Sequence, residues 1–118
     1  MKTPWGPSQS SVPVAPGITF YSTASHGGYF VAASKRKAMP AMIRDIPTFC
    51  GREGWYEEDA DWALLPFAFP HHFNSAECDA AISTVHTYHA NKFDVAAYFT
   101  TELGHELLSR ASLEDGAA

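Results

Sequence analysis

A dense group of carboxylates lies between two tryptophans near the middle of the chain. Residues 55–62 read Trp-Tyr-Glu-Glu-Asp-Ala-Asp-Trp. Clustered carboxylates repel one another unless a cation neutralises them. Tryptophan adds a large, rigid contact area. The cation could be an arginine, a metal ion or the basic surface of a partner, and these choices give different chemistry.

Three interpretations of this acidic run stay open. Carboxylates at a strand-to-helix junction are stabilised by the helix N-terminus, which would explain Glu58, Asp59 and Asp61. A Mg²⁺ or Ca²⁺ site needs oxygen ligands from several segments, and the spacing does not match an EF-hand loop. Aromatic and charged side chains together also suit a protein interface. The residues predicted to contact a partner are Trp55, Tyr56, Glu57, Glu58, Asp59 and Asp61.

A second candidate is the histidine in residues 22–28, Ser-Thr-Ala-Ser-His-Gly-Gly. Hydroxyls beside a histidine suggest a nucleophile, but no Gly-x-Ser-x-Gly elbow is present. Two glycines after His26 are typical of a hairpin turn, so a structural turn is the first expectation. The alternative is a small enzyme or metal-dependent module. In it, His26 is the catalytic acid or base, and the carboxylates of residues 57–61 bind a metal or orient the base.

The six histidines and two cysteines form no recognisable metal motif. His86 and His89 share a helix face, and Glu102 could approach them, but His-Glu-x-x-His is absent. Cys50 and Cys78 lack a CxxC pair and are expected to be free thiols. No phosphate-binding glycine loop is present. We therefore expect no bound metal and no cofactor.

The composition is typical of one small, acidic globular domain. The chain has 118 residues, of which 46% are hydrophobic, too many for a disordered chain. Thirteen acidic and eight basic residues give a net charge of −5, which argues against direct nucleic-acid binding. No apolar run approaches the roughly 20 residues that span a bilayer. A signal peptide is also absent, so we expect a cytoplasmic protein without a membrane partner.

The order of elements favours an α+β fold, with a small N-terminal antiparallel sheet packed by C-terminal helices. Residues 1–16, rich in proline and serine, predict an extended N-terminal arm. Residues 17–24 and 29–31 predict a β-hairpin with His26 at its tip. Residues 48–56 predict either a second hairpin or a single strand entered by a loop.

Helices are predicted mainly in the second half of the chain. Ser34 is the predicted cap of a short helix over 35–39, and Asp59 or Glu58 that of a helix from about residue 60. The remaining predictions are helices over 75–90, with a capping box from Asn74 and Glu77, and over 93–109, with a flexible tail at 111–118. The short link between the two long helices predicts antiparallel neighbours. Residues 17–110 would form one domain.

Several short motifs resemble a small domain found in proteins of phages, plasmids and other mobile elements. They are Thr-Pro-Trp-Gly-Pro-Ser-Gln at 3–9, Ala-Pro-Gly-Ile at 15–18, Ser-Thr-Ala-Ser-His-Gly-Gly at 22–28, Met-Pro at 39–40 and Trp-Tyr-Glu-Glu-Asp-Ala-Asp-Trp-Ala at 55–63. The resemblance covers about residues 3 to 70. That domain often has cysteine at the position of Ala60. It has no established activity, so the resemblance implies a genetic setting only.

Size, charge and setting together resemble those of anti-CRISPR proteins. We therefore expect a protein that binds a host defence complex, with a CRISPR–Cas component as the first candidate. It would inhibit the complex by masking a basic protein surface. In this hypothesis Trp55 and Tyr56 are the anchors and the carboxylates of residues 57–61 supply charge. The sequence does not specify the oligomeric state.

Overall fold

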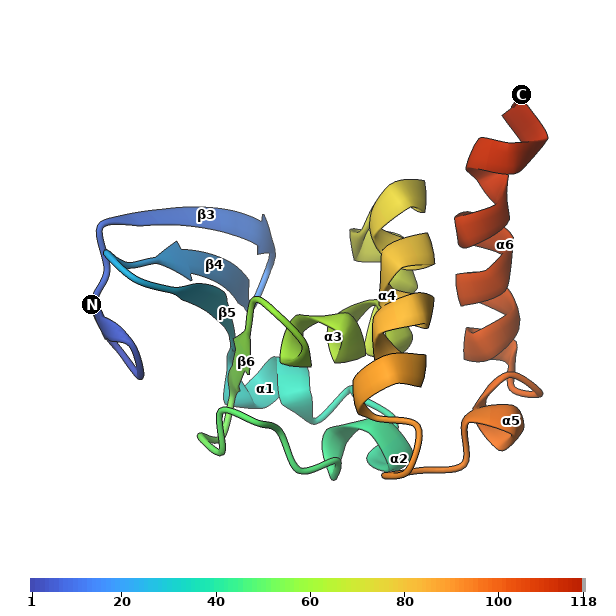
Figure 1. Cartoon of the computed structure of the whole chain (residues 1–118), viewed down its shortest axis with the longest axis horizontal. Coiled ribbons are helices and arrows are strands. Elements are labelled where there is room, and N and C mark those ends of the chain that lie inside the picture. Colours follow the sequence, from blue (N-terminus) through green and yellow to red (C-terminus); the bar gives the residue numbers. More distant parts are fainter. Residues whose placement is uncertain (118) are drawn as a thin grey trace. The chain divides into compact units, whose positions relative to one another are not determined.

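The computed structural model describes residues 1–117, with side chains described for residues 1–112 (Figure 1). These residues form two compact units. Unit 1 contains residues 1–39 and 47–62, and unit 2 contains residues 40–46 and those from 63 onward. All strands belong to unit 1 and the long helices to unit 2. The predicted α+β class, with an N-terminal antiparallel sheet and C-terminal helices, is confirmed.

Unit 1 contains a four-stranded antiparallel sheet whose spatial order follows the chain. Its strands are β3 (Ser10–Ala15), β4 (Ile18–Ser22), β5 (Gly27–Val31) and β6 (Trp55–Glu57). Strands β4 and β5 form the predicted hairpin, in which Ile18 lies opposite Val31 and Ser22 opposite Gly27. Residues 48–54 form a loop before the single strand β6, so the second of the two predictions for this segment is confirmed.

The N-terminal segment is more structured than an extended arm. Strands β1 (Lys2–Thr3) and β2 (Gly6–Pro7) form a small hairpin, and β3 pairs with β4 at the edge of the larger sheet. An edge strand tolerates Pro13 because one side of its backbone needs no partner strand. The pairing register shifts just after this proline. Because β3 is an edge strand, the proline content of residues 1–16 did not prevent strand formation, and the prediction of an extended arm missed this strand.

Helix α1 (Ala33–Arg36) follows the sheet in unit 1, and its cap differs from the prediction. Ala32 is the N-cap residue and makes no side-chain cap hydrogen bond, whereas Ser34 lies inside the helix. The prediction of Ser34 as the cap is therefore wrong. The helix contributes Arg36, which donates to the carbonyl oxygen of Val31 at 2.7 Å and to Glu53 Oε1 at 3.2 Å. These contacts join α1 to the sheet and to the loop before β6.

Unit 2 is helical. Its elements are α2 (Ala41–Arg44), α3 (Leu64–Ala68), the 3-10 turn η2 (Pro70–His72), α4 (Ser75–Tyr88), α5 (Val95–Tyr98) and α6 (Glu102–Ala117), and the 3-10 turn η1 (Asp61–Ala63) precedes α3. The core contains side chains from most of these elements, including Leu64, Phe67, Val85, Tyr98 and Leu107, each at most 1% exposed.

The start of α4 confirms the predicted capping box. The N–H of Glu77 donates to Asn74 Oδ1 at 2.8 Å, and the N–H of Asn74 donates to Glu77 Oε1 at 2.9 Å. Helix α4 packs beside α6 (Figure 1). The Ser75 hydroxyl donates to the carbonyl oxygen of Ala111 at 3.4 Å, so the start of α4 lies at the later part of α6. The two helices are therefore antiparallel, as predicted.

The predicted helix over 93–109 is instead two helices. Asp94 caps α5 by accepting from the N–H of Ala97 at 2.9 Å. The Thr101 hydroxyl accepts from the N–H of Gly104 at 3.0 Å and donates to the carbonyl oxygen of Tyr98 at 2.6 Å. Side chains that bond the local backbone favour helix ends over helix interiors. Helix α6 then continues to Ala117, and the expected flexible tail overlaps it, with Ala118 outside the described residues.

No helix in the described part of the chain is both long and apolar enough to cross a membrane.

Candidate functional site

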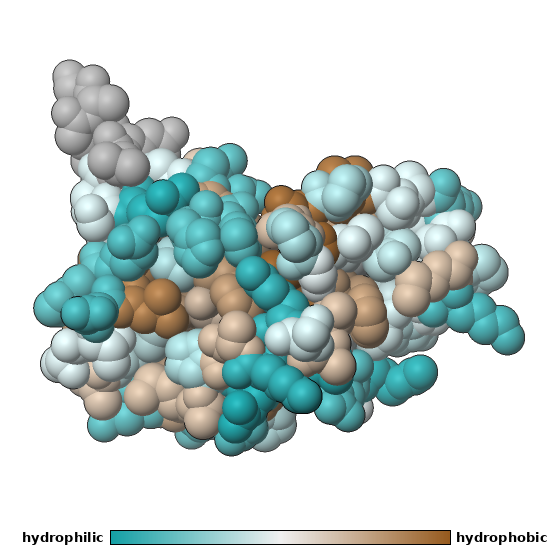
Figure 2. All heavy atoms as spheres, turned by 180° about the vertical axis from the view of Figure 1, so that it is seen from behind, coloured by the Kyte–Doolittle hydropathy of each residue, from teal (hydrophilic) through white to brown (hydrophobic). Residues whose placement is uncertain are grey.

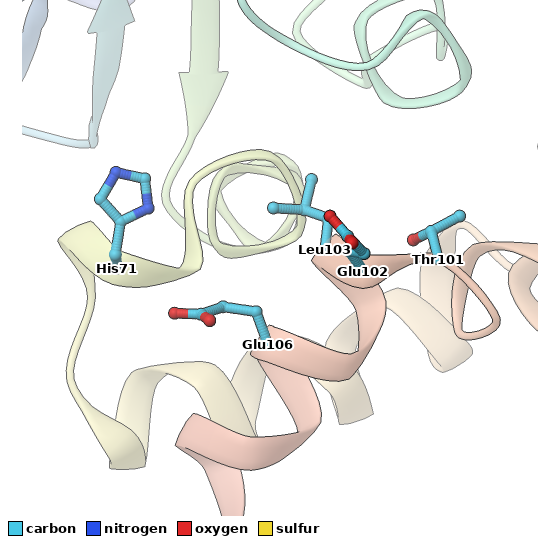
Figure 3. A pocket seen from close by; sticks show the side chains of 5 residues that line it. All are labelled: His71, Thr101, Glu102, Leu103 and Glu106. Atoms are coloured by element: carbon cyan, nitrogen blue, oxygen red, sulfur yellow. The ribbon is translucent and has the colours of Figure 1, made fainter.

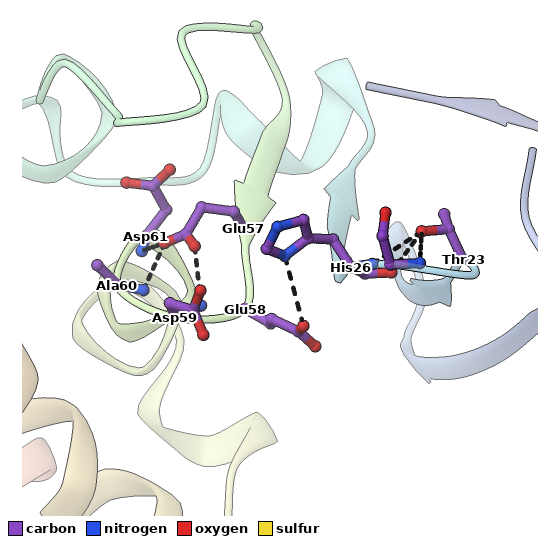
Figure 4. Close-up of polar contacts among 8 residues, drawn as sticks. Thr23, His26, Glu57, Glu58, Asp59, Ala60 and Asp61 are labelled. Atoms are coloured by element: carbon purple, nitrogen blue, oxygen red, sulfur yellow. Dashed lines mark hydrogen bonds and ion pairs between the residues drawn. The ribbon is translucent and has the colours of Figure 1, made fainter. Parts of the chain in front are cut away.

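The acidic run forms its own hydrogen-bonded turn (Figure 4). Glu57 ends β6, and its carboxylate accepts hydrogen bonds from three successive backbone N–H groups. The distances are 2.9 Å from Asp59 and 2.6 Å from Asp61, and Ala60 makes the third contact. The predicted caps were Glu58 or Asp59, so the structure assigns this role to a different carboxylate. Glu57 thereby satisfies donors that would otherwise lack partners before η1.

Asp61 connects this turn to the loop that precedes β6. Its side chain is fully buried, and its two carboxylate oxygens accept from the N–H groups of Phe49 and Cys50, each at 2.9 Å. A buried carboxylate is stable only when hydrogen bonds compensate its lost hydration. Asp61 is therefore a structural group that fixes the conformation of residues 48–51, and a partner cannot reach its carboxylate in this structure.

The two predicted aromatic anchors are also buried. Trp55 is 7% exposed, with its ring centroid 4.9 Å from that of Phe30 and 5.8 Å from that of Trp5. Tyr56 is 4% exposed, and its hydroxyl lies 3.8 Å from the sulfur of Met39. The expectation that these side chains contact a partner is corrected, because both belong to the core of unit 1. Consecutive residues of a strand point to opposite faces, and here both faces of β6 are covered, so an alternation of buried and exposed residues could not predict this burial.

Two carboxylates of the run remain exposed, those of Glu58 and Asp59. Glu58 Oε1 lies 3.8 Å from Nδ1 of His26, and both side chains are about half exposed. This is the proximity that the enzyme alternative required of His26. Both side chains lie at the surface of unit 1.

The residues around His26 form a turn, as first expected. The Thr23 hydroxyl donates to the carbonyl oxygen of His26 at 2.7 Å and accepts from its N–H at 3.0 Å. Gly28 allows close packing, because a Cβ there would overlap the Trp5 ring and lie 2.7 Å from the carbonyl oxygen of Tyr56. Gly28 therefore lets the Trp5 ring lie directly on the sheet, beside Trp55.

The predicted histidine face does not assemble a metal site. His86 is exposed, whereas His89 is fully buried with Nδ1 3.2 Å from Nζ of Lys92. Glu102 lines a pocket with His71 instead of joining the other two histidines. Among the side chains described, those of residues 1–112, no three His, Cys, Asp or Glu groups lie together so that they could hold a metal ion.

Both cysteines are free thiols, as predicted. Burial raises the pKa of the Cys50 thiol and that of the Cys78 thiol above the ordinary value. A thiol is a nucleophile only after it loses its proton, so both are poorly suited to covalent catalysis at neutral pH.

Sequence reasoning missed an acidic pocket in unit 2. This open pocket has a volume of about 670 Å³ and is lined by His71, Thr101, Glu102, Leu103 and Glu106. Figure 3 shows His71 on η2 facing side chains from the start of α6. The i, i+4 spacing of the two glutamates was the available signal, because residues at this spacing share a helix face. The opposing histidine comes from a segment far away in sequence.

The fold and the site together define a small α+β protein whose densest carboxylate cluster supports its own backbone. Residues 1–113 match the family described as Domain of unknown function (DUF7007), and the chain belongs to that family. The expectation of a small domain without an established activity is confirmed by this match. Comparisons with curated proteins and with solved structures found no match.

Proposed function

We propose that this protein is a non-enzymatic binding protein that inhibits a host defence complex by masking a basic protein surface. The observation that carries this proposal is the distribution of charge between the two units. Unit 1 contains five basic and five acidic residues. Unit 2 contains three basic residues and eight acidic ones, so the whole negative excess belongs to the helical unit.

The charged residues of each unit can be read from the sequence. Unit 1 contains Lys2, Lys35, Arg36, Lys37 and Arg52, and Glu53, Glu57, Glu58, Asp59 and Asp61. Unit 2 contains Arg44, Lys92 and Arg110, and Asp45, Glu77, Asp79, Asp94, Glu102, Glu106, Glu114 and Asp115. A surface with one sign of charge attracts a partner of the opposite sign and accelerates encounter. The helical unit is therefore the better candidate for contact with a basic partner.

Glu102 and Glu106 are the residues that we assign to this contact first. Both are exposed and line the same pocket. The ion pairs within residues 1–112 use His26, Arg36 and Arg44 as cations and involve neither glutamate. Like charges at i, i+4 destabilise a helix by about 0.2–0.5 kcal/mol. A lysine or arginine of a partner at this pocket would remove that repulsion and gain a charge-assisted contact.

The resemblance to mobile-element proteins suggests where such a partner would be met, namely in the cytoplasm of a bacterial host. A CRISPR–Cas component is the first partner to test, because these effectors hold nucleic acid in positively charged channels. An acidic protein of this size that occupies such a channel would compete with nucleic acid. It would need no catalytic group, no cofactor and no contact with nucleic acid.

The test compares two charge reversals of equal size. Glu102→Lys with Glu106→Lys changes the helical unit, and Glu58→Lys with Asp59→Lys changes the exposed carboxylates of unit 1. Tagged proteins would be used to isolate partners from host lysate, with washes at low salt and at about 0.5 M salt, where surface charges are largely screened. Inhibition of CRISPR interference against a targeted plasmid would be measured in parallel.

We expect wild type to retain a defence protein and to inhibit interference, and the unit 2 reversal to lose both. The unit 1 reversal should keep both, and circular dichroism should show both variants folded. If only the unit 1 variant lost partner retention and inhibition, the contact would instead be made by the acidic run of residues 57–61. A wild-type protein that neither retains a defence component nor inhibits interference would refute the proposed function.

The enzyme alternative rests on one specific distance, the 3.8 Å between His26 and Glu58. It predicts that His26→Gln abolishes turnover of a small substrate while the free energy of unfolding is unchanged. Because the histidine side chain is half exposed, this substitution should cost less than about 0.5 kcal/mol. Unchanged activity in His26→Gln would remove this residue from any catalytic role.

A further inference from the structure

Trp5 fills an aromatic slot on the four-stranded sheet. Its ring lies over Gly28, where an added Cβ atom would overlap it, and Tyr21 lies opposite this glycine on β4. The ring centroids of Trp5 and Trp55 are 5.8 Å apart, with the two planes nearly perpendicular. The rings of Tyr21 and Phe30 lie against Trp55, with centroid distances of 5.7 Å and 4.9 Å. The slot therefore has a glycine floor and aromatic walls, and its occupant in this structure is an indole ring.

The hairpin that carries Trp5 is closed by its own hydrogen bonds. Its strands β1 and β2 pair only with each other. The Thr3 hydroxyl donates to the carbonyl oxygen of Gly6 at 2.7 Å and accepts from the N–H of Trp5 at 3.1 Å. Within residues 1–112, whose side chains are described, no hydrogen bond joins residues 1–8 to another segment. Detaching this hairpin therefore breaks no hydrogen bond and costs mainly the packing of the Trp5 ring, so it belongs to the least stable part of unit 1.

Charge and surface both favour exchange of this hairpin over association through a broad face. Lys2 is the one charged side chain of residues 1–8, so an acidic protein of net charge −5 attracts the segment. In Figure 2, the apolar areas on the visible face are small and are bordered by hydrophilic side chains. Two copies that exchange an element already buried by the fold need no new apolar surface. The sheet holds the chain from Gln9 onward, because the N–H of Gln9 donates to the carbonyl oxygen of Ser22 at 2.7 Å.

We propose that the slot over Gly28 is a binding site for the Trp5 hairpin of a second copy, which enters when the chain's own hairpin detaches. The ligand of the site is thus a tryptophan carried on a short hairpin. The chain's own hairpin competes with it at an effective concentration on the order of millimolar, so exchange is weak in wild type. This proposal is independent of the proposed function, because it involves unit 1 alone and no host protein.

The experiment mixes two full-length variants with complementary defects and measures their mass by sedimentation equilibrium up to about 1 mM. Trp5→Ala keeps the slot and lacks the ring, whereas Gly28→Ala keeps the ring and fills the slot with its Cβ atom. Each variant alone should be monomeric, and an equimolar mixture should form a 1:1 complex. Trp5→Ala mixed with wild type should associate at least about tenfold more weakly, because the wild-type hairpin occupies its own slot. Gly28→Ala mixed with wild type is the control, since neither chain then has an empty slot.

A second measurement on wild type keeps the test decisive if Gly28→Ala does not fold, since its Cβ would also lie 2.7 Å from the carbonyl oxygen of Tyr56. In protein labelled with 5-fluorotryptophan, the fluorine resonance lost in Trp5→Phe is that of Trp5. Relaxation dispersion should show this resonance exchanging with a solvent-exposed state, and the Trp55 resonance should not do so. A Trp5 resonance without exchange would overturn the proposal. So would two folded variants that form no complex at about 1 mM, or a control mixture that associates equally well.

Discussion

Asp61→Asn tests most directly how the acidic run supports the fold. The carboxylate accepts from the N–H groups of Phe49 and Cys50, each at 2.9 Å, and is fully buried. An amide offers one oxygen, and its NH₂ group would face the second N–H donor. A hydrogen bond to a charged group contributes about 1.5–3 kcal/mol, and a buried donor left without an acceptor adds to the loss. We expect the free energy of unfolding to fall by about 2–4 kcal/mol.

The assay is urea unfolding followed by tryptophan fluorescence. With a denaturant slope of about 2 kcal/mol per M, the midpoint should fall by about 1–2 M, and the slope itself should not change. Asp59→Asn is the matched control, because it makes the same chemical change at an exposed carboxylate two residues away. It should alter stability by no more than about 0.5 kcal/mol.

Hydrogen exchange gives a local measure of the same contact. The backbone amides of Phe49 and Cys50 should exchange faster in Asp61→Asn than in wild type or in Asp59→Asn. A stability loss for Asp61→Asn no larger than that of the control would refute the assigned role. Unchanged exchange at these two amides would refute it independently of global stability.

Three further changes have expected outcomes that follow from single contacts. Burial raises the pKa of Tyr98, whose hydroxyl donates to a buried carbonyl oxygen at 2.7 Å. Its contribution to stability is thus complete below pH of about 10, the unfolded value, and is lost as pH rises towards the folded pKa. Tyr98→Phe should lower the free energy of unfolding by about 1–3 kcal/mol at pH 7 and reduce the alkaline loss of stability measured by urea unfolding at increasing pH. Gly28→Ala should lower the free energy of unfolding by about 1–3 kcal/mol, because the new methyl group overlaps the Trp5 ring. In a double-mutant cycle, the variant with both Gly28→Ala and Trp5→Ala should lose less stability than the sum of the losses of the two single variants. Asn74→Ala should lower the free energy of unfolding by about 1 kcal/mol, measured as a lower urea midpoint when unfolding is followed by circular dichroism at 222 nm. A variant as stable as wild type would contradict the capping role.

Much of the local structure followed from the sequence. The hairpin of β4 and β5 and the capping box of α4 were predicted because short-range signals specify them: β-branched and aromatic residues on both sides of a turn at His26, and an Asn74–Glu77 pair. The two glycines expected in that turn are instead the first residues of β5. The break between α5 and α6 was not predicted, because the helical spacing of apolar residues continues past Thr101. The Thr101 hydroxyl bonds to the carbonyl oxygen of Tyr98, and the helix is interrupted there. Backbone hydrogen bonds of short polar side chains compete with helix in a way that apolar spacing does not report.

The sequence by itself determined the α+β class, the free thiols, and the excess of negative charge. These depend on composition and on neighbours a few residues apart. Only the tertiary structure decided which carboxylates are accessible. Glu57 and Asp61 face the chain's own N–H groups, Glu58 and Asp59 face solvent, and Trp55 is buried. Adjacent acidic residues look alike in a sequence, and the partners that separate them, such as the N–H of Phe49, come from a loop eleven or twelve residues away. Burial against distant segments is a property of the folded chain, and it assigns residues of the same type to different roles.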